Sequence, residues 1–184
     1  MAKKIRIVYQ LMPHVIGGAE RFTFNLIKHL DRERFEPIIF SWMNGRVINL
    51  FKRLNVKIKI IEARYPNKLN ELVSFLKSSK ADIAQSTHFY AVLAMAADQA
   101  CVPHVWRISG HVHGICSGLR PKEGEYLLKI SAMLSKKLVC PTIFLKKQFR
   151  GVDRTKSVVI HNGVDIEHIS RLSPNYNVLK RHGC

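Results

Sequence analysis

Hydrophobic positions alternate between two patterns along the chain, from residue 5 to residue 160. Short apolar runs, typical of strands buried on both faces, are followed by segments in which apolar residues recur every three or four positions, as on one face of a helix. The predicted strands are Ile5–Tyr9, Phe35–Phe40, Val56–Ile61, Ile83–Ser86, His104–Ile108, Leu138–Cys140 and Val158–Ile160. The predicted helices are Ala19–Leu30, Arg46–Leu54, Leu69–Leu76, Phe89–Ala100, Tyr126–Leu134 and Phe144–Phe149.

This alternation predicts an α/β fold, a single doubly wound parallel sheet of six or seven strands with helices on both faces. Residues 1–170 form the predicted domain, because the pattern dissolves from Asp165 onward. The sequence Ser173-Pro174-Asn175 is typical of a linker, so we expect residues 171–184 to begin an interdomain connection.

The first strand passes through two glycines, Gly17 and Gly18, into a helix that begins at Ala19. Glycine allows close backbone approach, and the first N–H groups of a helix have no partner inside it. Two interpretations stay open: a phosphate or sugar lies against the glycines, or they form a tight turn that packs strand on helix. Glu20, in the first helical turn, either contacts a sugar or only complements the helix dipole.

Several segments with polar residues are expected to meet at one edge of the sheet, because ligands of open parallel sheets bind beyond the carboxyl ends of the strands. The stretch from Ser109 to Lys122 is predicted as a long loop, and such loops are more often functional than idle. The residues predicted to line one open face are Gly17, Gly18, His88, Ser109 to His111 and Thr142. The Gly17 backbone is expected within about 20 Å, two helix diameters, of the His111 ring.

These segments, in this order, resemble the N-terminal domain of a family 4 glycosyltransferase of the GT-B fold. The matching stretches are Gly17-Gly18-Ala19-Glu20-Arg21, Asp82 to His88, Cys101 to Val105 with Gly110-His111, and Val158 to Asp165 with its Asn162-Gly163-Val164-Asp165 signature. The resemblance implies a Rossmann-like domain that binds a glycan or lipid-linked acceptor, while a second domain binds a nucleotide diphosphate sugar. It implies transfer of the sugar with retention of configuration, without a further cofactor.

The resemblance also implies roles for residues of this chain. It places Gly17 and Gly18 against the donor diphosphate or sugar, and His111 near the reacting centre as the catalytic histidine. The candidates for acceptor binding are Glu20, His88, Arg107, Ser109, His113 and Thr142. His88 is equally explained by hydrogen bonds to neighbouring backbone, and Asn162-Gly163 is expected to have a mainly structural role.

The family's paired glutamates and its basic residues for the donor phosphates belong to the second domain, and nothing in Glu167–Cys184 resembles them. We therefore expect this chain to be inactive alone. It would be a fragment of a longer protein, a truncated gene product or one partner of a split enzyme.

The net charge is strongly positive, +17, from 30 basic and 13 acidic side chains. Residues 1–92 hold 16 basic and 7 acidic residues, and residues 93–184 hold 14 and 6, so the excess is spread through the fold. Such a field favours anionic partners of any kind. The alternative function is therefore a basic binding module, without catalysis, for nucleic acid or an anionic membrane surface. Nucleic acid is not expected, because aromatic residues are not interleaved with the basic ones.

Further alternatives concern single features. The helix 46–54 either packs its apolar stripe on the sheet or lies with that stripe on a membrane. His111 and His113 have metal-ligand spacing, but no third ligand follows, so no metal is predicted. The first loop lacks GxGxxG, and Ser41-Trp42 stands where a dinucleotide-dependent oxidoreductase has an acidic residue.

The apolar runs, the N-terminus and the cysteines bear on where in the cell the protein is expected. No apolar run approaches the length that spans a bilayer, and the N-terminus has no signal-peptide pattern. The four cysteines lack CxxC spacing and are interpreted as reduced thiols. We expect a cytoplasmic protein, with peripheral contact at the inner face of the membrane as an additional hypothesis.

Overall fold

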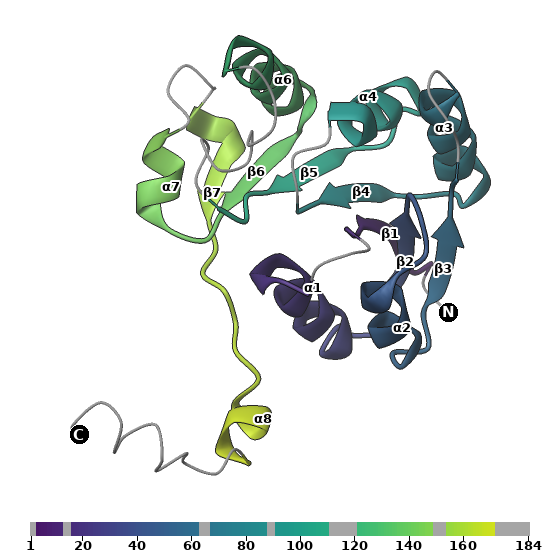
Figure 1. Ribbon diagram of the computed structural model, residues 1–184, viewed down its shortest axis with the longest axis vertical. Helices are drawn as coiled ribbons and strands as arrows, with labels where there is room; N and C mark the ends of the chain where they lie inside the picture. Colours follow the sequence, from purple (N-terminus) through teal and green to yellow (C-terminus); the bar gives the residue numbers. More distant parts are fainter. Residues whose placement is uncertain are drawn as a thin grey trace.

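The computed structural model describes residues 3–12, 16–62, 67–87, 91–110, 121–148 and 154–171. Seven strands form one all-parallel sheet in the order β3-β2-β1-β4-β5-β6-β7 (Figure 1). The strands are β1 (Ile5–Gln10), β2 (Phe35–Ser41), β3 (Lys57–Ile60), β4 (Ile83–Ser86), β5 (His104–Arg107), β6 (Lys137–Cys140) and β7 (Ser157–Val159). The helices are α1 (Gly18–Lys28), α2 (Arg46–Lys52), α3 (Lys68–Ser78), α4 (Ala91–Gln99), α6 (Pro121–Leu134), α7 (Ile143–Gln148) and α8 (Ile166–Ser170), with a 3-10 turn at Arg154–Lys156. The predicted doubly wound α/β fold is confirmed.

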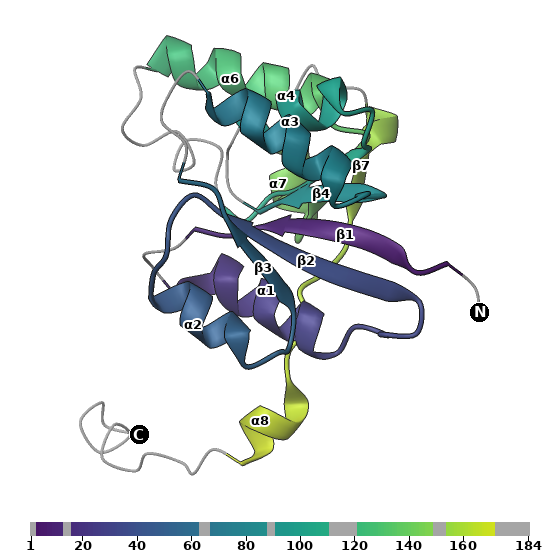
Figure 2. The same cartoon turned by 90° about the vertical axis from the view of Figure 1, so that its right-hand side faces the viewer.

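The sheet is the middle of three layers. Helices α1 and α2 cover one face, and α3, α4 and α6 cover the other (Figure 2). Along β1 the side chains alternate between these layers: Ile7 and Tyr9 join the core beneath α1 and α2, while Val8 joins the core beneath α3 and α4. A parallel sheet must be covered on both faces, which explains why the strands contain nearly continuous apolar runs.

The strand order reverses direction at β1. From β1 the chain adds β2 and β3 on one side, then crosses the sheet through α3 and adds β4 to β7 on the other side (Figure 1). This places the topological switch point between β1 and β4, where open α/β sheets bind ligands beyond the carboxyl ends of the strands.

Two helices differ from the sequence prediction. Helix α6 begins at Pro121, inside the stretch from Ser109 to Lys122 that was predicted as a loop. Proline suits the first helical position, whose N–H would have no partner, but the apolar periodicity becomes visible only at Tyr126. Helix α8 was not predicted, because a helix of one turn with no buried residue leaves no apolar pattern.

The apolar stripe of α2 packs on the sheet. Val47, Ile48 and Phe51 are all buried beneath this helix, with relative exposures of 0%, 1% and 0%. Phe51 also meets the Phe24 ring of α1 edge to face, with 5.6 Å between ring centroids. The alternative in which this stripe lies on a membrane is therefore wrong.

A histidine is fully enclosed between β4, β5 and the end of α6. His104 has a relative exposure of 2%; its Nε2 lies 3.1 Å from Ser86 Oγ, and its Nδ1 lies 2.9 Å from Ser135 Oγ. The Ser135 hydroxyl donates to the Ser131 carbonyl at 2.6 Å, so it accepts from Nδ1, and Nε2 accepts from Ser86. The ring is thus held neutral with both nitrogens paired, and burial lowers the pKa of His104 to about 4.

This histidine predicts acid destabilisation. The folded-state pKa lies below the unfolded value near 6.5, so the unfolded chain binds the extra proton first and stability falls as the pH drops from about 6.5 toward 4. At about pH 5 the expected loss of unfolding free energy is on the order of 2 kcal/mol relative to neutral pH. Urea unfolding should show this loss in the parent chain and a smaller loss in His104→Gln. Equal pH dependence in both chains would contradict the assignment.

Candidate functional site

The structure describes part of the predicted site. Gly17, Gly18, Ser109, Gly110 and Thr142 all follow strands at the same edge of the sheet, because β1, β5 and β6 belong to one parallel sheet. Three further predicted site residues, His88, His111 and His113, lie outside the described residues. The predicted distance between the Gly17 backbone and the His111 ring therefore stays a prediction.

The start of α1 is built around a buried carboxylate. Gly17 is the N-cap, and its N–H donates to Glu20 Oε2 at 3.1 Å, while Glu20 itself has a relative exposure of 2%. This is the half of a capping box that a glycine can make, because glycine has no side chain to return the bond. The carboxylate of Glu20 lies inward at the positive end of the helix and complements the helix dipole there.

The two glycines differ in their surroundings. A side chain added at Gly17 would place its Cβ 3.2 Å from Glu20 Oε2, whereas a Cβ at Gly18 would meet no atom within 4 Å. Gly18 is exposed at the first helical position, so nothing in the packing of the described residues requires a glycine there. Close approach of a ligand to this backbone stays a prediction.

Arg107 is buried behind α1. Its guanidinium lies 3.3 Å from the centroid of the Phe22 ring and donates to the Asn162 side chain, and only 4% of the residue is exposed. Burial lowers the pKa of Arg107 to about 10, which leaves the group protonated at neutral pH. The cation is compensated by the aromatic face and the amide oxygen. Direct contact of Arg107 with an acceptor stays a prediction.

A C-terminal tether, residues 160–171, leaves β7 and runs past α1 to α8 (Figure 1). Asp165 is its anchor: Oδ2 lies 2.6 Å from Lys28 Nζ and 3.4 Å from His29 Nε2, while Oδ1 accepts from the His168 N–H at 3.0 Å. The hydrogen bond from Lys28, followed by that from the His168 backbone, holds the pKa of Asp165 well below its usual range. The Asn162-to-Asp165 signature therefore fastens the tether to α1, and Asn162 has the structural contact expected of it.

The two hydroxyl residues of the predicted site, Ser109 and Thr142, are both at least partly exposed. Thr142 is exposed, and its Oγ1 accepts from the Leu145 N–H at 3.2 Å, which caps α7. Ser109 is half-buried just beyond β5. Both side chains stand at the expected edge, and their contact with an acceptor stays a prediction.

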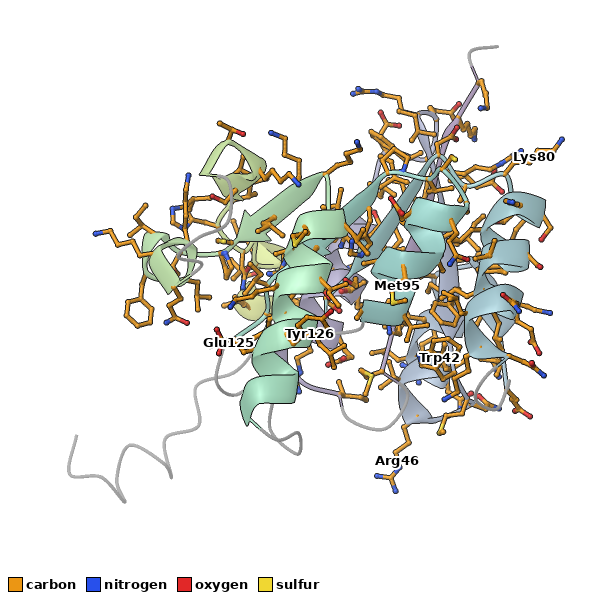
Figure 3. All side chains as sticks on the ribbon, turned by 90° about the horizontal axis from the view of Figure 1, so that it is seen from above. Trp42, Arg46, Lys80, Met95, Glu125 and Tyr126 are labelled. Atoms are coloured by element: carbon orange, nitrogen blue, oxygen red, sulfur yellow. The ribbon has the colours of Figure 1, made fainter. Side chains whose placement is uncertain are left out.

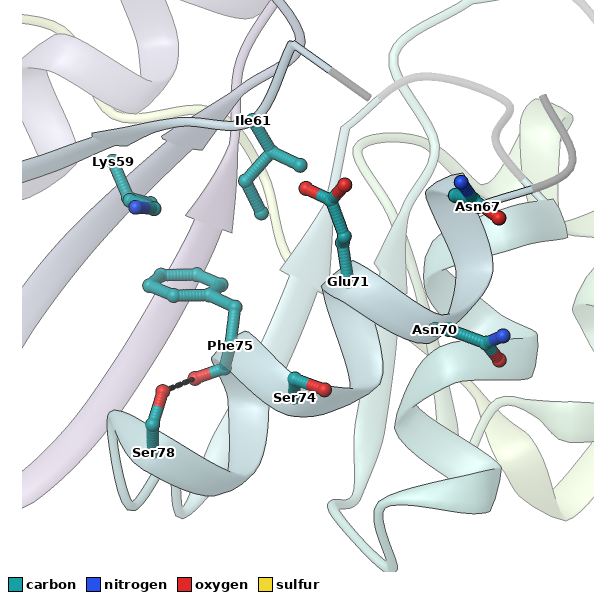
Figure 4. Close-up of a pocket in the computed structure, with 8 residues that line it drawn as sticks. All are labelled: Lys59, Ile61, Asn67, Asn70, Glu71, Ser74, Phe75 and Ser78. Atoms are coloured by element: carbon teal, nitrogen blue, oxygen red, sulfur yellow. Dashed lines mark hydrogen bonds between the residues drawn. The ribbon is translucent and has the colours of Figure 1, made fainter. Parts of the chain in front are cut away.

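A groove of about 530 Å³ lies between α3 and the edge strand β3, with Phe75, Glu71 and Lys59 among its lining residues (Figure 4). β3 is separated from the switch point by β2 and β1. A second groove, of about 430 Å³, lies against α1 and includes Ile16, Arg21 and Asp165 in its walls. Of these two grooves, the second adjoins the glycine turn, through Ile16.

Two of the basic side chains, Arg46 and Lys80, extend outward from well-separated parts of the domain (Figure 3). Within the described ranges, no three His, Cys, Asp or Glu side chains cluster as a metal ion would require. None of the described helices has both the length and the apolar character needed to cross a bilayer.

A family model described as Glycosyltransferase Family 4 matches residues 16–168 of the chain. No curated protein sequence matches this chain. Among solved structures, a glycosyltransferase from Rickettsia africae has a TM-score of 0.73 and 19% identity over 99% of this chain and 50% of its own. The structure of Anabaena Alr3699/HepE in complex with UDP-glucose has a TM-score of 0.74 and 16% sequence identity. The match covers 97% of this chain and 50% of the Anabaena chain.

A protein with a different activity has the same fold. The UDP-GlcNAc 2-epimerase of Methanocaldococcus jannaschii has a TM-score of 0.57 and 18% identity over 87% of this chain and 46% of its own. At these identities the similarity shows the fold alone, one half of a GT-B architecture. The chain spans about half the length of the solved chains that it matches.

The tether generates a prediction. Asp165→Ala removes the N-cap of α8 and the partner of Lys28, so the His168 amide should exchange its hydrogen on the order of tenfold faster. Hydrogen–deuterium exchange of the intact chain measures this. Glu167→Ala is the matched control, because Glu167 is exposed and lies 3.7 Å from Arg171 in a weak i,i+4 pair. Equal exchange in the two variants would show that Asp165 does not fasten the tether.

Proposed function

The chain belongs to glycosyltransferase family 4, and we propose that it is the acceptor-binding half of a retaining enzyme that transfers a sugar from a nucleotide diphosphate sugar. The observation that carries this proposal is the family match over residues 16–168. That range includes both the Gly17-Gly18 turn and the Asn162-to-Asp165 signature, which the fold joins through α1.

The start of α1 suits an uncharged sugar better than a phosphate. The Glu20 carboxylate already takes the Gly17 N–H and offsets the positive end of the helix, so an added anion gains less there. A sugar hydroxyl carries no charge and is not repelled by Glu20. In the proposed function the donor sugar approaches Gly18, where the backbone is open.

The roles of the other site residues follow the same proposal. His111 is the catalytic histidine near the reacting centre, and His88, His113, Ser109 and Thr142 contact the acceptor. Arg107 acts behind them, holding α1 through Phe22 and the tether through Asn162. Glu20 supports the glycine turn from within.

The proposed transfer requires a second domain. A departing nucleotide diphosphate needs positioned cations and N–H donors in a site that excludes water. In the described part of the chain, the turn at Gly17-Gly18 has only backbone N–H groups to offer, and one of these is taken by Glu20. The nucleotide would therefore be held by the half of the two-domain enzyme that this chain does not cover.

Turnover tests this function. Purified residues 1–184 should release no UDP from UDP-glucose, the donor bound by the Anabaena protein. Fusion to the half of the Rickettsia africae protein that this chain does not match should give sugar transfer to an added glycan or lipid-linked acceptor. Transfer by the unfused chain, or hydrolysis without transfer by an otherwise folded fusion, would contradict the proposal.

The same fusion tests the histidine. His111→Ala should lower turnover on the order of a hundredfold, the usual size of a positioned acid–base or electrostatic contribution. Donor affinity should change much less, because the residue lies near the reacting centre and not on the nucleotide. If the turnover number of His111→Ala is unchanged, the catalytic role would be assigned to His113 instead. His113→Ala is therefore measured beside it.

The glycine turn gives a further prediction. Gly18→Ala should preserve or slightly raise the unfolding free energy, by up to about 1 kcal/mol, because alanine is the better helix former and the space is open. If the donor sugar approaches this backbone, the same change should lower kcat/KM of the fusion enzyme at least tenfold, about 1.4 kcal/mol. Thermal unfolding and initial rates measure the two effects. Unchanged kinetics would leave Gly17 and Gly18 as a tight turn only.

A further inference from the structure

A groove follows one side of α1, between α2 and the tether (Figure 1). Its volume is about 430 Å³. The residues that line it come from α1 and the turn before it, from α2 and from the tether: Ile16, Arg21, Phe24, Asn25, Lys28, Leu50, Asp165 and His168. Arg21 and Lys28 are seven residues apart on the same side of the helix, so the groove extends about 10 Å along α1, from the glycine turn toward the tether.

Much of the lining of this groove is apolar. Phe24 and Leu50 are half-buried and pack against the core between α1, α2 and the sheet, while Ile16 is exposed. Sites for small molecules commonly measure about 300–1,000 Å³ and combine apolar walls with a few polar groups. A protein partner would cover about 800 Å² of this chain, far more than one side of the 11-residue helix α1 offers. The size and the lining therefore suit a small molecule with an apolar chain.

The charged groups of the groove are unevenly compensated. At the end beside the tether, Lys28 Nζ lies 2.6 Å from Asp165 Oδ2, so these two charges balance. At the other end Arg21 is exposed and has no salt bridge to any described residue. Its neighbour Glu20 is buried, with its carboxylate bonded to the Gly17 N–H. An anion is therefore favoured next to Arg21 rather than at the tether.

We propose that this groove binds a lipid-type amphiphile, with its apolar chain along Phe24 and Leu50 and an anionic head group, a phosphate, on Arg21. A guanidinium can donate two parallel hydrogen bonds to a phosphate, and a methylene chain gains free energy by leaving water. The head group would lie beside the glycine turn, which the donor sugar approaches in the proposed function. The inference rests on that function in one respect: the amphiphile is the acceptor, and what its head group carries receives the sugar.

Binding of monomeric alkyl phosphates tests the groove. In the ¹⁵N-labelled intact chain, the side-chain amide of Asn25 should shift with octyl and decyl phosphate below their micelle concentrations. The amide of Asn70, in the groove beside β3, should not shift. Decyl phosphate should bind about fifteenfold more tightly than octyl phosphate, because each further methylene that leaves water contributes about fourfold. An equal shift of Asn25 with inorganic phosphate, or an affinity independent of chain length, would overturn the proposal.

Variants at exposed positions separate the head group from the chain. Arg21→Gln should weaken binding of decyl phosphate on the order of tenfold and leave that of neutral decyl glucoside unchanged. Lys77→Gln, on α3 across the sheet, removes the same charge and should change neither affinity. Ile16→Asn should weaken both ligands, because it replaces an apolar group where the groove begins.

Two results with these variants would overturn the proposal. An equal loss in Arg21→Gln and Lys77→Gln would mean that the ligand responds to the overall charge of the chain and not to the groove. Concentration-dependent dimers in which the Asn25 amide shifts without any ligand would mean that a second copy of the chain fills the groove.

Failure of the groove and failure of the transferase are distinguishable. If the alkyl phosphates bind as expected but the fusion enzyme transfers no sugar, the groove is supported and the proposed transferase is overturned. If the fusion enzyme transfers sugar to a soluble glycan while no alkyl phosphate binds, the transferase is supported and the groove is overturned. Where both hold, Arg21→Gln should raise the KM of the fusion for an amphiphilic acceptor on the order of tenfold, with kcat nearly unchanged.

Discussion

The requirement that a parallel sheet be covered on both faces governs this structure. β1 lies inside the sheet, paired with β2 and β4, and sends Ile7 and Tyr9 to one layer and Val8 to the other. Each crossover helix then has to bury one apolar stripe, which fixes α1 and α2 below the sheet and α3, α4 and α6 above it (Figure 2). The polar groups that remain for ligands are those at the carboxyl ends of the strands.

The fold could be predicted from the sequence because its signals are local. The apolar run Ile5–Tyr9 and the spaced apolar residues of α1 each reflect burial on known faces, and every predicted strand has a counterpart in the sheet. The predicted helix boundaries differ from the observed ones where no apolar periodicity marks them. Helix α6 begins at Pro121, and its first turn is favoured by the backbone geometry of proline. A helix of one turn such as α8 depends on its N-cap, Asp165. An N-cap residue alone does not predict a helix from the sequence, because aspartate is also common in turns.

The site was less predictable, because its contacts join distant segments. Glu20 was correctly linked to the helix start, since its partner is three residues away. The pairing of Lys28 with Asp165 spans 137 residues, and no sequence pattern specifies it. Arg107 was considered only as a ligand contact, because stacking on Phe22 depends on how far α1 leans over β5.

The contacts of the tether have a mechanical consequence. The same short segment contacts α1 at two points, at Phe22 in its middle through Asn162 and Arg107, and at its last residue Lys28 through Asp165. A helix is stiff along its axis, so two contacts are enough to fix its direction relative to the sheet. Gly18 is the first residue of the same helix. The tether thereby helps to fix the position of the glycine turn without touching it.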